Sequence, residues 1–112
     1  MAEVQKVSKE EEIISKIRHY YPTDSKILEH AFLFAKDAHS VQKRDSGEPY
    51  IIHPMGVADI LIDLGMDIAT ICAAFLHDVL EDTSVSEEKL IKEFGTEVCE
   101  LVKGVTKLDK II

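Results

Sequence analysis

The segment FLHDVLEDT, residues 75–83, places four ionisable side chains at the end of the most hydrophobic stretch of the chain. They are His77, Asp78, Glu81 and Asp82. An imidazole beside a carboxylate suits a transition metal such as manganese, iron or zinc. Nearby carboxylates can take up or release protons as general acids and bases. This segment is therefore the first candidate for a chemically active site.

The preceding residues, DIATICAAFL, predict a buried helix that continues through the segment. On such a helix the four ionisable groups share one flank over about one and a half turns. Carboxylates crowded together repel and favour a nearby cation, either a metal ion or basic side chains. The alternative is a solvated helix end with a satisfied, partly buried histidine. Spacing alone leaves both interpretations open.

Two further histidines, His39 and His53, fall at predicted helix ends or in loops. His53 lies in RDSGEPYIIHP, where Gly47, Pro49 and Pro54 interrupt the helical pattern. We expect a loop of about ten residues there, and loops of that length in a compact domain often carry function. His53 is therefore a second candidate ligand.

The elements that must position these residues are predicted to be helices throughout. Segments with helical spacing run over about 9–21, 25–43, 54–64, 67–82, 86–94 and 96–108. Ser8, Asp67 and Ser84 are expected to cap three of them. Strand-like alternation does not persist anywhere. The predicted class is a single all-α domain of five or six helices.

Composition and charge narrow the possible classes of function and the expected location. Lys and Arg number 13 and Asp and Glu number 21, which gives a formal charge of −8 and disfavours nucleic-acid binding. An apolar run of about 18 residues is missing, so no membrane span is expected. Cys72 and Cys99 are expected to be reduced packing thiols. Without a signal-like N-terminus, the expected location is the cytoplasm.

The segments AFLHDVLEDT and SGEPYIIHP together resemble the hydrolase domain of the RelA/SpoT family. These are HD-superfamily proteins that make and degrade the alarmones guanosine tetra- and pentaphosphate (ppGpp and pppGpp). The similarity extends over about residues 25–108. It implies an HD-type helical fold and, in the stringent response, metal-dependent hydrolysis of the alarmone 3′-pyrophosphate to GDP or GTP and pyrophosphate. The parent protein would also be a GTP pyrophosphokinase.

The resemblance implies a role for each candidate residue. His53, His77 and Asp78 match the metal ligands of the family, whose ion is usually Mn²⁺. Glu81 and Asp82 match its catalytic acidic pair beside the reacting pyrophosphate. The ion would activate water and would offset the charge of the alarmone.

Arg44 and Ser46 match positions that contact the nucleotide, and a guanidinium can stack on a base or pair with phosphate. Asp45 departs from the family, which often has a basic residue there, and would repel phosphate. The fourth metal ligand of the family, an aspartate, would be expected beyond Ile112.

These departures predict that residues 1–112 form the N-terminal part of an HD domain. We expect this chain alone to be inactive and prone to self-association, because uncovered apolar surface promotes it. Two alternatives remain open. One is a regulatory or nucleotide-binding HD module that lacks catalysis, and the other is an HD phosphohydrolase acting on a different nucleotide.

Overall fold

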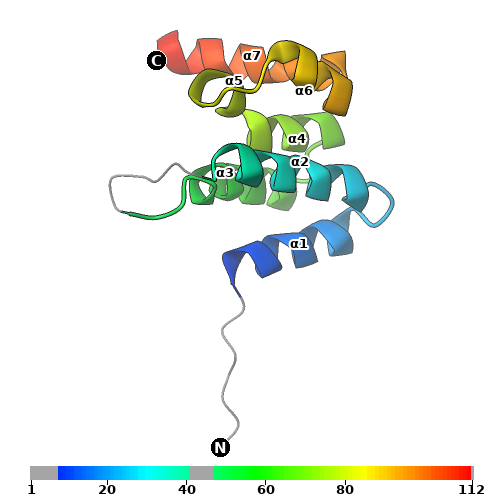
Figure 1. The fold of residues 1–112 in the computed structure, drawn as a ribbon. Coiled ribbons are helices and arrows are strands. Elements are labelled where there is room, and N and C mark those ends of the chain that lie inside the picture. The colour runs from blue at the N-terminus through cyan, green and yellow to red at the C-terminus, as the bar shows by residue number, and fades with distance from the viewer. Residues whose placement is uncertain (1–7, 41–46, 112) are drawn as a thin grey trace, which may run out of the picture.

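The computed structural model describes residues 8–40 and 47–111. Helices make up most of this part of the chain, so the predicted all-α class is confirmed (Figure 1). The helices are α1 (Lys9–Tyr20), α2 (Ser25–Ala38), α3 (Ile52–Asp63), α4 (Ile68–Leu76), α5 (Val79–Asp82), α6 (Glu87–Phe94) and α7 (Thr96–Ile111). None of the helices in these residues has the length and hydropathy needed to cross a bilayer.

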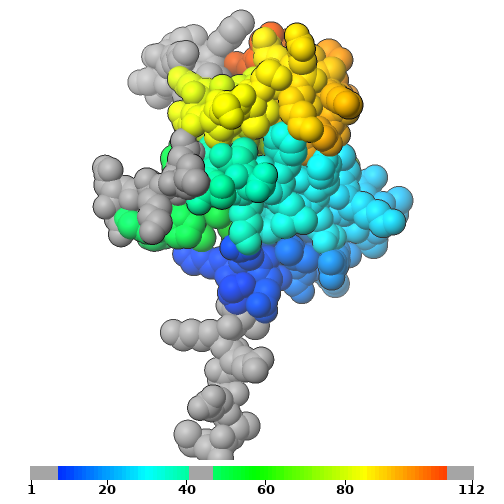
Figure 2. All heavy atoms as spheres, in the orientation of Figure 1, coloured from blue at the N-terminus to red at the C-terminus, as the bar shows by residue number. Residues whose placement is uncertain are grey.

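Helix α4 is the centre of the domain. It packs against α2, α3 and α7, and every residue from Ile71 to Leu76 is buried. A helix that is apolar on all sides is stable only when other elements surround it. In Figure 1 it lies between α2 and α3 on one side and α5 to α7 on the other, with α1 as the outermost layer. Figure 2 shows α2 in cyan across the middle of one face, between α1 and the yellow-to-orange α5 and α6.

Local sequence explains most of the helix boundaries. The side chain of Ser8 accepts a hydrogen bond from the Glu11 amide at 3.1 Å, as the predicted capping box requires. Helix α3 ends in a Schellman motif, in which the Met66 amide bonds to the Leu61 carbonyl and Gly65 adopts a positive φ of 69°. Asp67 then caps α4 by accepting from the Thr70 amide. These three predicted boundaries are confirmed.

The cap of α6 differs from the prediction. Ser86, not Ser84, is the N-cap, and its side chain accepts from the Lys89 amide at 3.1 Å. Thr83 accounts for the shift, because its hydroxyl donates to the Val79 carbonyl and accepts from the Val85 amide. These bonds terminate α5, and α6 begins only at Glu87.

The predicted helix over residues 67–82 is divided in two. It is interrupted at His77 and Asp78, which form the turn between α4 and α5. His77 and Asp78 therefore lie at a helix junction, and Glu81 and Asp82 follow on α5.

Candidate metal centre

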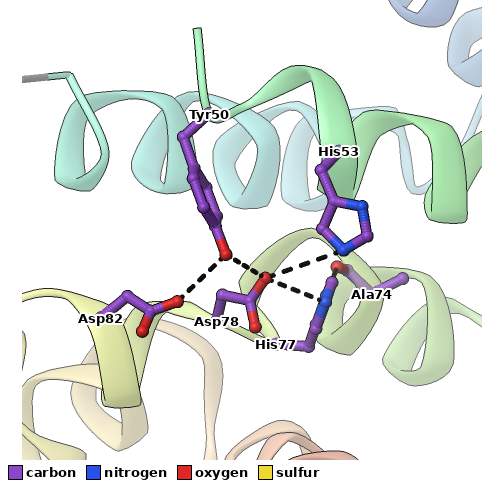
Figure 3. Close-up of polar contacts among 6 residues, drawn as sticks. All are labelled: Tyr50, His53, Ala74, His77, Asp78 and Asp82. Carbon is purple, nitrogen blue, oxygen red and sulfur yellow. Dashed lines mark hydrogen bonds and ion pairs between the residues drawn. The ribbon is translucent and has the colours of Figure 1, made fainter. Parts of the chain in front are cut away.

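The candidate residues come from two places in the fold that face each other. The first is the start of α3, where the His53 amide donates to the Tyr50 carbonyl at 3.1 Å and Pro54 occupies the first turn. The second is the α4–α5 turn, which carries His77 and Asp78. Figure 3 shows the side chains of both segments converging between the helices. Because α3 packs directly on α4, the two segments are held together by the core.

Three of the predicted ligands are brought together. One ligand atom from each of His53, His77 and Asp78 can be chosen so that all three lie within 4.8 Å of one another. Asp78 Oδ2 lies 3.1 Å from His77 Nε2 and 3.9 Å from His53 Nε2. Metal–ligand distances of about 2.0–2.2 Å, as for zinc, allow two ligands of one ion to lie up to roughly 4.4 Å apart. Both distances to Asp78 fit this limit.

The orientation of His77 also suits metal binding. Its side chain is buried, and Nδ1 lies 2.7 Å from the Ala74 carbonyl oxygen. A carbonyl oxygen only accepts hydrogen bonds, so Nδ1 carries the proton. In the neutral ring the Nε2 lone pair then faces Asp78. A metal-ligating histidine is commonly fixed in this way by a bond from its other nitrogen.

The electrostatics of Asp78 favour its charged form. Burial is the largest single effect and would raise the pKa of this carboxyl group, but the surrounding hydrogen bonds and charges, those of His77 first, together lower the pKa. The hydroxyl of Tyr50 and the nearby His53 act in the same direction. Two electron-pair donors, Nε2 and Oδ2, thus lie 3.1 Å apart and need a cation between them, either a proton or a metal ion. Two imidazoles and a carboxylate fit a divalent transition metal.

The acidic pair of α5 is placed differently from the ligands. Glu81 and Asp82 are both exposed on α5. Asp82 reaches the site through Tyr50, whose hydroxyl lies 3.0 Å from Asp82 Oδ2. The two predicted nucleotide-contacting residues, Arg44 and Ser46, lie outside the described residues, as does Asp45.

Tyr50 is a site residue that the sequence reasoning missed. Its hydroxyl lies 2.9 Å from Asp78 Oδ2 as well as 3.0 Å from Asp82 Oδ2 (Figure 3). One sequence feature could have indicated it: Tyr50 precedes His53 by three residues, so the two side chains lie on the same side if the chain is helical there. Histidine and carboxylate types stood out in the sequence, whereas an aromatic residue in a loop carries no charge pattern.

A cavity of about 270 Å³ adjoins the histidines. His53 and His77 form part of its wall, and the rest comes mainly from apolar side chains of α3, α4 and α7, including Leu61 and Leu101. Thr70 adds a hydroxyl group. The candidate centre therefore opens on one side onto a largely apolar hollow.

Comparison with known proteins agrees with this geometry. The family model described as "HD domain" matches residues 31–112. A guanosine-3′,5′-bis(diphosphate) 3′-pyrophosphohydrolase of Aquifex aeolicus is 49% identical over 99% of this chain and 16% of its own length. The bifunctional (p)ppGpp synthase/hydrolase SpoT of Escherichia coli is 51% identical over 85% of this chain and 14% of its own length.

A probable GTP pyrophosphokinase of Mycobacterium leprae is 48% identical over 91% of this chain and 13% of its own length. The chain thus spans less than a fifth of each of these three relatives. The matches confirm the resemblance to RelA/SpoT proteins that the two motifs predicted. The all-α architecture, the paired His77–Asp78 and the family match lead to one conclusion: the chain belongs to the HD-domain family.

Proposed function

We propose that this chain contributes the metal-binding centre of a hydrolase that removes the 3′-pyrophosphate of guanosine tetra- or pentaphosphate. The observation that carries the proposal is the convergence of His53, His77 and Asp78 within 4.8 Å. Support for the substrate comes from the names of the relatives, several of which are guanosine-3′,5′-bis(diphosphate) 3′-pyrophosphohydrolases. The products would be GDP or GTP and pyrophosphate.

In this proposal the three ligands hold Mn²⁺, the ion that the family resemblance implies. A divalent ion bound there would supply a Lewis acid and would offset the negative charge of the substrate. The chain itself carries a formal charge of −8, so a polyphosphate substrate needs such an offset. His77 is held by Ala74 with Nε2 directed at Asp78, and the partly exposed His53 would supply the other imidazole ligand.

Glu81 and Asp82 would be the catalytic acids. Both are exposed on α5, within reach of a substrate that approaches from solvent. A carboxylate in that position can take a proton from the attacking water and hand it on. Arg44 and Ser46 would contact the nucleotide. The proposal also includes a GTP pyrophosphokinase activity of the whole protein, which the name of one relative supports. It further includes a cytoplasmic location, which the composition supports.

Pyrophosphate release tests the proposal. The full-length gene product is incubated with guanosine tetraphosphate at saturating Mn²⁺, and His77→Ala and Asp78→Asn variants are compared with the wild type. Both variants should lose Mn²⁺-dependent release. Asp78→Asn is included because it keeps the shape of the side chain if His77→Ala, a buried change, impairs folding.

Asp24→Asn is the matched control. Asp24 is an exposed aspartate at the N-terminus of α2, whereas the candidate centre lies near the other end of that helix, and asparagine is an equally good cap. This variant should keep wild-type turnover. Wild-type turnover in Asp78→Asn, or cleavage of other nucleotides in preference to the alarmone, would contradict the proposal.

A further inference from the structure

The hydroxyl of Tyr50 contacts two carboxylates that belong to different parts of the proposed site. It lies 2.9 Å from Asp78 Oδ2, in the α4–α5 turn, and 3.0 Å from Asp82 Oδ2, at the end of α5. A tyrosine hydroxyl has one proton, so it donates to one carboxylate at a time and links the two. Tyr50 is therefore the direct connection between a proposed metal ligand and a proposed catalytic acid (Figure 3).

The bond to Asp78 involves the oxygen that matters for metal binding. Oδ2 is the atom that lies 3.1 Å from His77 Nε2 and 3.9 Å from His53 Nε2. A carboxylate oxygen has two lone pairs. With one directed at the Tyr50 hydroxyl, the other is directed towards the histidines. The Tyr50 hydroxyl and the two imidazoles thus approach the same carboxylate oxygen.

Tyr50 is itself anchored by the fold. Its ring packs on the ring of the buried His39, with centroids 4.6 Å apart and planes inclined by 30°. His39 forms the C-cap of α2, so the tyrosine is supported by a core helix. The Tyr50 carbonyl also accepts from the His53 amide at 3.1 Å, which places the two side chains on one turn. The hydroxyl is therefore held at a defined point between α3 and α5.

We propose that Tyr50 is a positioning residue whose hydroxyl fixes the Asp78 carboxylate towards the metal ion and the Asp82 carboxylate beside it. This inference rests on the proposed function, because it assigns Tyr50 to the same site. Residues that orient metal ligands by hydrogen bonding typically contribute 10–100-fold to metal affinity or activity. The alternative is that Tyr50 only packs against His39.

Tyr50→Phe separates these two roles, because phenylalanine keeps the ring and its packing but loses the hydroxyl. In the full-length protein, Mn²⁺ affinity is measured by electron paramagnetic resonance and alarmone hydrolysis by pyrophosphate release. The variant should bind Mn²⁺ about 10-fold more weakly. At saturating Mn²⁺, kcat should fall about 10-fold, whereas KM and the melting temperature should stay close to wild type.

Tyr20→Phe is the matched control, since Tyr20 is an exposed tyrosine on α1. It should match the wild type in every readout. A double-mutant cycle with Asp82→Asn then separates the two bonds of the hydroxyl. Adding Tyr50→Phe to Asp82→Asn should leave kcat unchanged but should still weaken Mn²⁺ binding, because the bond to Asp78 is independent of Asp82.

Wild-type Mn²⁺ affinity and kcat in Tyr50→Phe would overturn the inference and leave Tyr50 as a packing residue. Additive effects on kcat in the double mutant would overturn the link to Asp82. These outcomes differ from failure of the proposed function, in which the wild type itself would not hydrolyse the alarmone at saturating Mn²⁺. In that case Mn²⁺ affinity alone still tests the role of Tyr50 toward Asp78.

Discussion

The Nδ1 atom of His77 lies 2.7 Å from the carbonyl oxygen of Ala74, three residues earlier in the chain. This bond uses a backbone carbonyl at the end of α4, a group that lacks a partner within the helix once the helix stops. It also fixes which ring nitrogen carries the proton. The contact thus directs Nε2 towards Asp78 at the point where α4 ends.

The tautomer of His77 follows from this contact. In the metal-free protein, Nδ1 should carry a proton whether or not a second proton lies between Nε2 and Asp78 Oδ2. Long-range ¹H–¹⁵N correlation spectra of ¹⁵N-labelled protein distinguish the two nitrogens by their chemical shifts. His19, which is exposed on α1, serves as an internal comparison without such a bond. A neutral His77 protonated on Nε2 would show that the bond to Ala74 is absent in solution.

The N-cap of α6 can be tested with a matched pair of serines. Ser86→Ala removes the side-chain bond to the Lys89 amide and should lower the free energy of unfolding by about 1 kcal/mol. Ser84→Ala changes an exposed residue outside the helix and should stay within about 0.5 kcal/mol of the wild type. Urea denaturation measures both. A larger loss of stability in Ser84→Ala than in Ser86→Ala would show instead that Ser84 is the cap, as the sequence pattern predicted.

Protonation of Asp67 at low pH should lower the stability of the fold. The Thr70 hydroxyl, 2.6 Å away, is the main cause that lowers the pKa of this carboxyl below its ordinary value of 3.8, and backbone amides assist. A group with a depressed folded-state pKa stabilises the fold fully above its ordinary pKa. That stabilisation is lost as the pH falls through the lower folded value.

The measurement compares the wild type with Asp67→Asn, which keeps a capping side chain but does not titrate. The difference in their free energies of unfolding should be constant from about pH 7 to pH 5 and should shrink towards pH 2. A difference that does not change over this acid range would mean that Asp67 is not held by Thr70 in solution.

The two cysteines should be unreactive in the folded protein. Burial raises the pKa of the Cys72 thiol to about 12, and burial is also the main cause that raises the pKa of Cys99. The thiolate is the reactive form, so little of it exists at about pH 8. A disulfide reagent such as DTNB should label neither cysteine quickly in buffer and both in concentrated urea. Rapid labelling of native protein would contradict the predicted packing role.

Much of the fold could be predicted from the sequence because local signals set it. Ser8, Gly65 and Asp67 mark helix ends through hydrogen bonds to residues at most five positions away. The division of the helix at His77–Asp78 could not be predicted in this way. Both residues are compatible with a helix, so their types alone give no sign of the turn at the end of α4.

The candidate centre, too, could be predicted only in part from the sequence. His53, His77 and Asp78 were predicted from residue type and from the family resemblance, and the structure brings them together. Tyr50 was missed because its contacts to Asp78 and Asp82 span 28 and 32 residues of sequence. Contacts over such separations depend on how α3 docks on α4, which no local pattern specifies.

The central claim is that His53, His77 and Asp78 hold one divalent ion, and Mn²⁺ binding tests it most directly. Free Mn²⁺ is followed by electron paramagnetic resonance while the wild type, Asp78→Asn and the Asp24→Asn control are titrated. Loss of a ligand should cost more than loss of a hydrogen bond that only orients a ligand, so Asp78→Asn should weaken binding by more than about 100-fold. The wild type and Asp24→Asn should each bind one ion. Equal binding by Asp78→Asn, or none by the wild type, would contradict the claim.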